Sequence, residues 1–272
     1  MKKTLIIVFV VGLVGIGFFA YRSTGIRTIL SNRYKEAGLA EYNKGNYQEA
    51  VVNYTRGIKL NPTYALLYSY RGGAKMELGD YQGAEEDVNR AIELEPNGGG
   101  HWFARALLKN EMKRPREALA DINKAIELDP EADAEVYLNR GFIKEDLKDC
   151  KGAIKDFTRV IELNPTEVLA YAHRSGCYNS MQQYRAAVAD DTRVLELDPT
   201  VVPAYYTRGS SRMELKDYTG AISDYTKFIE LSTNPKLRSK AYQFRAQAKQ
   251  ALGDLAGAQA DMKKAQELAI SK

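Results

Sequence analysis

The sequence predicts an all-α protein, a solenoid built from seven tandem pairs of antiparallel helices. Seven times along the chain an aromatic residue is followed sixteen positions later by an alanine, and the aromatic residues are 34 to 37 positions apart. A period in this range is typical of repeat arrays. The aromatic/alanine pairs are Tyr34/Ala50, Tyr68/Ala84, Trp102/Ala118, Tyr137/Ala153, Tyr171/Ala187, Tyr205/Ala221 and Tyr242/Ala258. In the first five units a proline follows twelve residues after the alanine, at Pro62, Pro96, Pro130, Pro165 and Pro199.

The first element is an uninterrupted apolar segment over residues 5–21, preceded by Lys2 and Lys3 and followed by Arg22. As a helix it would be about 25 Å long, at the short end of what crosses a bilayer core. We expect a retained single-pass membrane anchor over residues 1–21, and a cleaved signal peptide is the alternative. The two lysines favour a cytoplasmic N-terminus, which places the repeats outside the cytoplasm. Cleavage would instead give a periplasmic or secreted protein.

A basic linker over residues 22–30 leads into the repeats. The predicted units are residues 31–64, 65–98, 99–133, 134–167, 168–201, 202–238 and 239–272. Both halves of a unit have helical periodicity, and an Asp or Asn between them, such as Asn46 or Asp80, is expected to cap the second helix. The proline ends the second helix because it disfavours helical backbone at the residue before it. Gly98 to Gly100 is predicted to form a loose turn, with a hinge as the alternative.

Numbered from its first residue, each unit has an aromatic residue at position 4, a small residue at position 8 and alanine at position 20. This pattern, with proline at position 32, resembles the tetratricopeptide repeat and covers residues 31–272. The resemblance implies a right-handed superhelix whose concave face binds a polypeptide partner. Position 24 is apolar in that family, and Asp191 in the fifth unit departs from the pattern.

Units two to seven share an arginine at position 7 and an aspartate at position 23. If positions 8 and 20 face each other on antiparallel helices, positions 7 and 23 lie within side-chain reach. We predict six structural ion pairs, partly exposed and each worth at most about 1 kcal/mol. A basic stripe awaiting an anionic ligand is the alternative. The predicted pairs are Arg71/Asp87, Arg105/Asp121, Arg140/Asp156, Arg174/Asp190, Arg208/Asp224 and Arg245/Asp261.

The family resemblance places positions 2, 5, 9, 12 and 13 on the concave face, where apolar and aromatic side chains alternate with acids. Such a groove suits a segment that carries apolar anchors together with Lys or Arg. The alternative is that these residues are solvated or pack between units. The predicted groove residues are Tyr42, Met76, Glu77, Phe103, Leu107, Glu111, Leu138, Phe142, Glu145, Asp146, Tyr206, Met213 and Glu214.

Charge and cysteine content narrow the class of partner. The net charge is +4, but residues 1–30 hold four basic residues and no acid, which leaves 35 basic and 35 acidic residues in 31–272. A neutral repeat region argues against nucleic-acid binding, which needs a basic face.

Cys150 and Cys177 lack metal-binding spacing and fall at different repeat positions. We expect isolated thiols, with a disulfide as the alternative.

Motifs for catalysis are missing from the sequence. His101 and His173 stand in different units without a metal or catalytic spacing around them, and no phosphate-binding or dinucleotide-binding motif occurs. We therefore expect no enzymatic activity, no cofactor, no metal and no small-molecule substrate. The sequence predicts a membrane-tethered protein-interaction scaffold, within an envelope assembly. A soluble exported binder and an accessory subunit that positions an enzyme are the alternatives.

Overall fold

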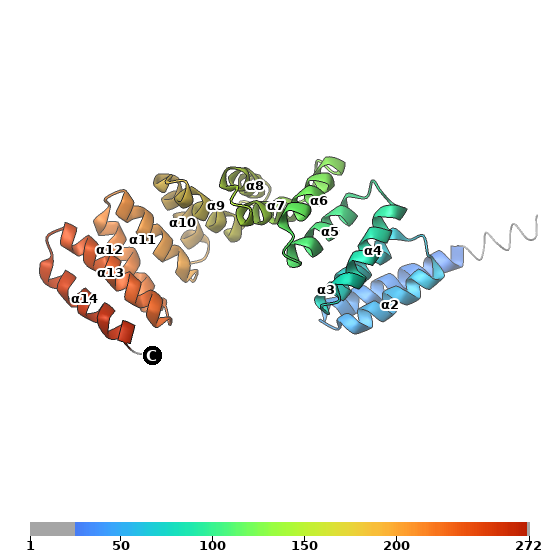
Figure 1. Cartoon of the computed structure of the whole chain (residues 1–272), viewed down its shortest axis with the longest axis horizontal. Helices are drawn as coiled ribbons and strands as arrows, with labels where there is room; N and C mark the ends of the chain where they lie inside the picture. Colours follow the sequence, from blue (N-terminus) through green and yellow to red (C-terminus); the bar gives the residue numbers. More distant parts are fainter. Residues whose placement is uncertain (1–24, 271–272) are drawn as a thin grey trace, which may run out of the picture. The chain divides into compact units, whose positions relative to one another are not determined.

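The computed structural model describes residues 25–270, in which helices are joined by short turns and no strand occurs. A first helix covers residues 25–43, and thirteen more follow in order (Figure 1). They are α2 (Tyr47–Leu60), α3 (Ala65–Glu77), α4 (Tyr81–Leu94), α5 (Gly99–Glu111), α6 (Pro115–Leu128), α7 (Ala134–Asp146), α8 (Cys150–Leu163), α9 (Val168–Ser180), α10 (Tyr184–Leu197), α11 (Val202–Glu214), α12 (Tyr218–Leu231), α13 (Pro235–Ala251) and α14 (Leu255–Ile270). The anchor expected over 1–21 lies outside the described residues. Within 25–270, no helix combines the length and apolar character needed to cross a membrane.

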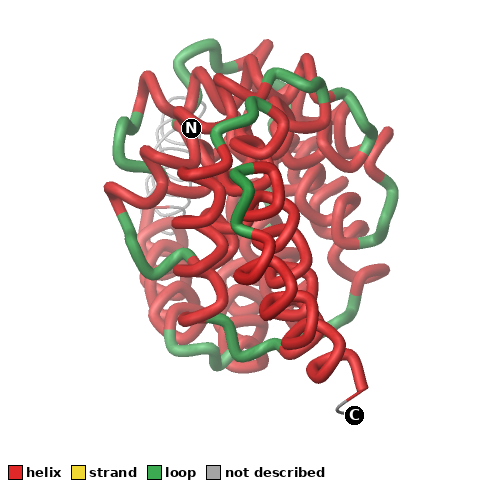
Figure 2. Tube along the Cα trace, turned by 90° about the vertical axis from the view of Figure 1, so that its left-hand side faces the viewer, coloured by secondary structure: helices red, strands yellow, loops and turns green. Residues whose placement is uncertain are grey.

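The chain divides into two compact units, Met1–Glu131 and Ala132–Lys272. From α2 to α6, and again from α7 to α14, each helix packs against the next one along the chain. The first helices of successive repeats are also in contact: α3 contacts α5, and α9 contacts α11. Short loops make the connections (Figure 2). The predicted all-α solenoid is therefore confirmed as a stack of helix pairs in each compact unit.

The turn inside each helix pair depends on one residue with left-handed backbone. Position 15 of every unit has positive φ, at Gly45, Gly79, Lys113, Lys148, Gln182, Lys216 and Gly253. At this residue the chain leaves the first helix, and its N–H donates to a carbonyl three residues earlier, as Gly79 does to Met76 at 2.9 Å. Glycine adopts this conformation without steric cost, whereas lysine and glutamine do not.

The predicted caps of the second helices are confirmed for aspartate. The Asp80 carboxylate accepts from the Gly83 N–H at 3.0 Å. The same bond recurs at Asp149, Asp217 and Asp254. The prediction is wrong for Asn46, whose side-chain amide donates to Glu41 at 2.7 Å instead of capping α2.

The loose turn predicted at Gly98 to Gly100 is also wrong. Gly98 is the N-cap of α5, and Gly99 and Gly100 form its first turn. Helical backbone is open to glycine when tertiary packing favours it, and propensity alone does not decide a helix end.

The aromatic residue and the proline of the repeat pattern meet in space. The Tyr68 hydroxyl donates to the carbonyl of Pro62 at 3.1 Å, and the Trp102 indole N–H donates to the carbonyl of Pro96 at 2.9 Å. Tyr171 and Tyr205 make the equivalent bonds to Pro165 and Pro199. Each bond ties the first helix of one unit to the turn that ends the preceding unit.

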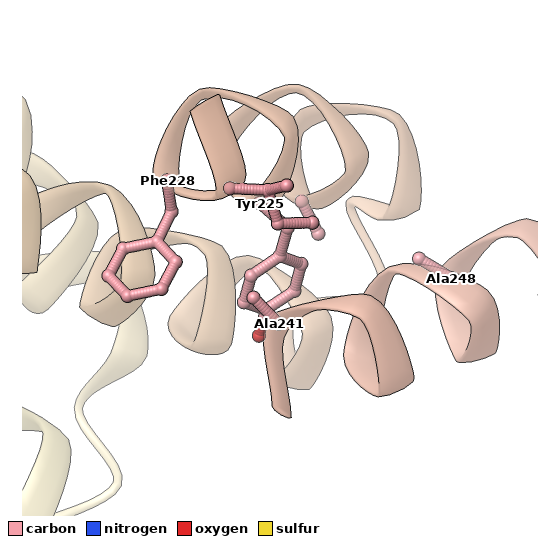
Figure 3. Close-up of a cluster of buried hydrophobic side chains, with 6 residues drawn as sticks. Tyr225, Phe228, Ala241 and Ala248 are labelled. Atoms are coloured by element: carbon pink, nitrogen blue, oxygen red, sulfur yellow. The ribbon is translucent and has the colours of Figure 1, made fainter. Parts of the chain in front are cut away.

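The core lies between the two helices of each pair and between successive pairs. Alanines at position 20 are 0 to 8% exposed, and in the first six repeats the side chain at position 24 is buried as well. In the second compact unit, Tyr225 and Phe228 of α12 lie against Ala241 and Ala248 of α13 (Figure 3). Small residues at position 8 make room for such rings: a Cβ at Gly141 would overlap the ring of Phe157.

Candidate functional site

The arginine at position 7 is held on several sides, as the third repeat shows. Arg105 donates from Nε and Nη2 to the two carboxylate oxygens of Asp121, both at 2.8 Å. Its Nη1 donates to Asn89 Oδ1, on the second helix of the preceding repeat, at 2.8 Å. Lys109 Nζ lies 2.7 Å from the same aspartate, and the guanidinium carbon is 4.7 Å from the centre of the Trp102 ring. The cluster joins helices within a repeat and between repeats.

The forked pair is present in all six predicted repeats. The Nη2–Oδ1 distances are 2.5 to 2.8 Å at Arg71/Asp87, Arg105/Asp121, Arg140/Asp156, Arg174/Asp190, Arg208/Asp224 and Arg245/Asp261. A second cation, four residues after the arginine, also reaches the carboxylate in five of them: Lys75 at Asp87, Lys109 at Asp121, Lys144 at Asp156, Arg212 at Asp224 and Lys249 at Asp261. In the fifth repeat Tyr178 stands at that place, and among the described residues Asp190 is paired with Arg174 alone.

The prediction of partly exposed pairs is wrong for the aspartates, all six of which are buried. Asp87, Asp121, Asp156, Asp190, Asp224 and Asp261 are 4, 4, 2, 5, 2 and 4% exposed. Position 23 lies on the second helix next to the buried position 24, so the first helix of the same repeat covers the carboxylate. The arginine side chains remain 14 to 18% exposed. The value of at most about 1 kcal/mol, which assumes partly exposed partners, therefore does not apply to these pairs.

Burial of the aspartates also bears on the alternative of a basic stripe. Despite burial, the guanidinium of Arg105 and the ammonium of Lys109 hold the pKa of Asp121 below its usual range, so the carboxylate is charged. An anionic ligand would have to displace such carboxylates to reach the arginines. The paired and buried aspartates support a structural role for the arginine–aspartate pairs, and this role remains a prediction.

A pocket of about 490 Å³ opens in the first compact unit, on the side formed by helix 25–43, α3 and α5. Three predicted groove residues line it: Tyr42, Met76 and Leu107. Phe103, Glu77 and Glu111 do not line the pocket. Phe103 is half-buried, and the two glutamates are exposed. The lining also includes residues that the groove positions omitted, chiefly Leu39, Asn43, Tyr54, Leu66, Ser69, Tyr70, Gly72, Gly73, Val88, Gly100, His101, Ala104 and Leu108.

Two glycines, Gly73 and Gly100, leave space in this pocket because they carry no side chain. A Cβ at Gly73 or Gly100 would meet no atom within 4 Å, so both positions face open space. Position 9, occupied by Gly73 in the second repeat, is Leu107 in the third and Phe142 in the fourth. The sequence feature that could have indicated this pocket is therefore the pair Gly73 and Gly100, which stand among large aromatic residues.

The pocket is apolar, with tyrosines at its wall and an acid at its edge. Of the described residues that line it, none is Lys, Arg, Asp or Glu. Tyr54 is 1% exposed, and burial raises the pKa of its hydroxyl. The Tyr42 hydroxyl donates to Glu77 Oε1 at 3.3 Å, and burial together with that carboxylate raises the pKa of Tyr42 to about 12. Both tyrosines are neutral at physiological pH, and Glu77 is held next to the pocket by its bond with Tyr42.

A chain of polar contacts runs along one wall of the pocket, through the buried residues Ser69 and His101. Ser69 Oγ of α3 lies 2.7 Å from Nδ1 of His101 in α5, whose Nε2 lies 3.2 Å from Glu95 Oε2. Ser69 is 8% and His101 4% exposed. His101 is thus a residue of α5 that links two helices and the loop after α4.

In the second compact unit, several predicted groove residues contribute to packing. Phe142 lies 4.6 Å from the ring of His173, ring centre to ring centre, and His173 Nδ1 is 2.7 Å from Glu145 Oε2. Tyr206 packs among Tyr225, Phe228 and Phe244, at centroid distances of 5.1 to 6.1 Å. Leu138 and Met213 are half-buried, and Asp146 and Glu214 are exposed. Phe142 and Tyr206 therefore have structural roles that a binding test must separate from recognition.

The departure at Asp191 produces a buried acid. Asp191 is 2% exposed, and its Oδ2 has no hydrogen-bond partner among the described residues. Burial raises its pKa to about 7, opposed by the Ser175 and Thr207 hydroxyls and by the charge of Arg208. The carboxyl occupies the place that an aromatic or aliphatic side chain fills in other repeats.

The two cysteines are unpaired thiols, but they lie near each other. Both thiols are free, and the Cys150 side chain on α8 lies near enough to Cys177 on α9 to help raise the pKa of its thiol. Their different repeat positions concealed this proximity, because one is on the second helix of the fourth repeat and the other on the first helix of the fifth. Among residues 25–270, no cluster of three or more His, Cys, Asp or Glu side chains is suited to hold a metal ion.

Comparison with solved structures shows which folds this chain shares. The C-terminal part of a TPR repeat-containing protein from Cytophaga hutchinsonii is similar over 87% of this chain and 96% of its own, with a TM-score of 0.71 and 17% identity. PilF of Pseudomonas aeruginosa is similar over 80% of this chain and 98% of its own (TM-score 0.69, 17% identity). YrrB, described as a TPR protein with an unusual peptide-binding site, covers 69% of this chain and 96% of its own (TM-score 0.64, 19% identity). At these identities the likeness shows the fold alone.

Family models give the decisive comparison, and no curated protein matches the sequence. The model described as "TPR repeat" matches residues 38–79. The tetratricopeptide repeat model matches 68–97, 102–131, 134–167, 202–235 and 239–269. Together the matches cover more than half of the sequence. They pass over residues 168–201, the repeat that holds Asp191. The chain belongs to the tetratricopeptide repeat family.

Proposed function

We propose that this protein is a non-enzymatic, membrane-tethered scaffold that binds a segment of a partner polypeptide on the helix face formed by the first helices of its repeats. The observation that carries the proposal is the apolar pocket of the first compact unit, with its glycine-hollowed floor and neutral tyrosine wall. Pockets of a few hundred cubic ångströms lined by aromatic and aliphatic side chains suit a buried side-chain anchor. The peptide-binding site described for YrrB, a protein of the same fold, is in keeping with this role.

The partner segment carries a bulky apolar side chain next to a Lys or Arg. The apolar residue fits the uncharged lining of the pocket. The cation pairs with Glu77, which stands beside the pocket through its bond with Tyr42 and is solvent-exposed. An acid at the rim of an apolar site favours a basic partner and disfavours an acidic one.

The tether is the apolar segment over residues 5–21, with the repeats outside the cytoplasm and within an envelope assembly. Exposed apolar residues at the start of the first helix support this location: Ile26, Ile29 and Leu30 are 51, 69 and 38% exposed. A membrane interface would cover such side chains. Washed membranes should retain the full-length chain through high salt and carbonate. A shortened chain in the soluble fraction would identify the cleaved, exported alternative.

Affinity purification from crosslinked cells tests partner binding. Gly73→Leu should abolish recovery of the partner, because the new side chain grows into open space in the pocket. The matched control is Gly176→Leu, at the same repeat position in α9, where a Cβ meets only Glu145 at 3.8 Å. Both changes replace a helical glycine and should not weaken folding. Equal recovery with both variants would rule out the pocket. A single enzyme recovered in stoichiometric amount would identify an accessory subunit.

A further inference from the structure

The fourth and fifth repeats carry both cysteines of the chain at one helix–helix interface. Cys150 is the first residue of α8, and Cys177 lies in the second half of α9. These two helices pack against each other within the second compact unit. Across this packing the Cys150 side chain contributes to raising the pKa of the Cys177 thiol, so the two thiols are neighbours. Elsewhere in the sequence, position 17, that of Cys150, is Tyr, Pro or Leu, and position 10, that of Cys177, is Ala, Leu, Ile or Ser. The pair is thus particular to this one interface.

The two thiols differ in accessibility. Cys150 is half-buried at the end of its helix, where solvent reaches it, whereas Cys177 is 0% exposed. Glu145 and Asp149 lie within electrostatic range of Cys177 and, with burial, oppose its ionisation. A soluble oxidant therefore meets Cys150 first, and Cys177 is placed to react only with its neighbour.

We propose that Cys150 and Cys177 form a reversible intramolecular disulfide that joins α8 to α9, with a small-molecule or protein disulfide as the oxidant. In the first step the Cys150 thiolate attacks one sulfur of the oxidant, forms a mixed disulfide and releases one thiolate. In the second step Cys177 loses its proton and attacks Cys150 Sγ, which releases the second thiolate of the oxidant. Two protein thiols are oxidised and one disulfide is reduced to two thiols, so electrons and protons balance.

The bond would fix the interface between two consecutive repeats. The two thiols already lie near each other across the native packing of α8 on α9, so cross-linking removes freedom mainly from the unfolded chain. Glu145, which lies 2.7 Å from His173 Nδ1, is within electrostatic range of Cys177. Outside the cytoplasm, where the repeats are proposed to lie, disulfides persist; in the cytoplasm they are kept reduced. The proposal concerns the thiols themselves and does not depend on any partner.

Redox titration of the purified full-length chain tests this. The chain is equilibrated with set ratios of oxidised to reduced glutathione, quenched with N-ethylmaleimide, and weighed intact. We expect a species that has lost two hydrogens and takes no alkyl group, formed at a glutathione ratio that leaves the urea-unfolded chain as a dithiol. Its Tm should exceed that of the reduced chain.

Cys150→Ser and Cys177→Ser are the matched controls. The Cys177→Ser chain should stop at a glutathione adduct on Cys150, and the Cys150→Ser chain should take up no glutathione while folded. The proposal is overturned if the folded parent chain stops at the adduct, links to a second copy, or forms the internal bond only in urea. It is also overturned if the oxidised chain melts below the reduced one, because the bond would then strain the native interface.

Discussion

A single carboxyl, that of Asp191, sets the fifth repeat apart from the others. It is buried where other repeats place rings or aliphatic chains, and its pKa is raised to about 7. The folded state therefore holds this proton more tightly than the unfolded state, in which the carboxyl titrates near its ordinary value of about 3.9. The contribution of Asp191 to the free energy of unfolding is therefore present at low pH and is lost as the pH rises through about 7.

Chemical unfolding at two pH values should reveal this effect. Between pH 5.5 and 8.5, Asp191 should lower the free energy of unfolding of the parent chain by about 2 kcal/mol. Asp191→Asn removes the titrating group and should remove that part of the slope, so that the variant is the more stable protein at pH 8.5. The other ionisable groups are common to both chains and cancel in the comparison. Parallel pH profiles for the two proteins would contradict the assignment.

The arginine–aspartate pairs permit a second comparison between residues. Arg174→Met leaves the buried Asp190 without a cation, whereas Arg105→Met leaves Asp121 with Lys109 at 2.7 Å. Uncompensated buried charges cost about 3 to 5 kcal/mol, so the Arg174 variant should lose about 3 kcal/mol and the Arg105 variant about half as much. Urea unfolding measures both. Equal losses would show that the second cation contributes nothing.

If the pairs are structural, neither variant should change partner recovery at a temperature where it remains folded. Loss of the partner with a folded Arg105→Met chain would favour the alternative of a basic stripe for an anionic ligand.

At the scale of the helix pair, the left-handed turn residue is a weak point in four repeats. Glycine occupies this position in three repeats, and Lys113, Lys148, Gln182 and Lys216 occupy it in the others with φ near 60°. A side chain in this conformation costs about 1 kcal/mol or more relative to glycine. The sequence pattern showed that a turn lies there, but the φ value required at position 15 became clear only from the backbone.

Lys216→Gly should therefore stabilise the second compact unit by about 0.5 to 1 kcal/mol, the relief of backbone strain exceeding the added freedom of the unfolded chain. The control is Lys155→Gly, at an exposed interior position of α8, which should destabilise by about 1 kcal/mol. Thermal unfolding distinguishes the two signs. A loss of stability with Lys216→Gly would mean that the lysine makes contacts that outweigh the strain.

Elements were predictable where the pattern repeats, and the site was predictable only in part. Aromatic, alanine and proline spacing located every helix pair, and aspartate caps followed from residue type. The pocket depends on Tyr54 and Tyr70, whose positions 24 and 6 belong to the packing layer in most repeats. Phe142 illustrates the converse, a groove position whose ring packs on His173. Contacts between different repeat positions, such as that of the two thiols, have no periodic signal.

The ion pairs show what spacing alone leaves open. The matched positions 7 and 23 predicted which residues pair, but not how deeply the carboxylates lie. Asp156 and Asp224 are each 2% exposed, and Asp87 is 4% exposed. Aspartate is mostly a surface residue, and its burial here depends on cations supplied by the other helix of the pair.

At the scale of the whole molecule, the central claim is that the first compact unit anchors a partner polypeptide in its pocket. The second compact unit differs: its corresponding face is filled by packed rings around Tyr206 and by the His173–Glu145 pair. Recognition by a buried side chain is expected to concentrate binding energy on a few residues. Binding should therefore depend strongly on the first unit and weakly on the second.

Site-specific photocrosslinking in living cells tests that claim most directly. A photoreactive phenylalanine analogue is placed at Leu107, which lines the pocket, and, as a control, at Arg159, which lies outside the pocket and is among the more exposed residues of α8. We expect one crosslinked protein from position 107, lost with Gly73→Leu and kept with Gly176→Leu, and none of it from position 159. The same protein crosslinked from both positions, or one from position 107 that survives Gly73→Leu, would contradict it.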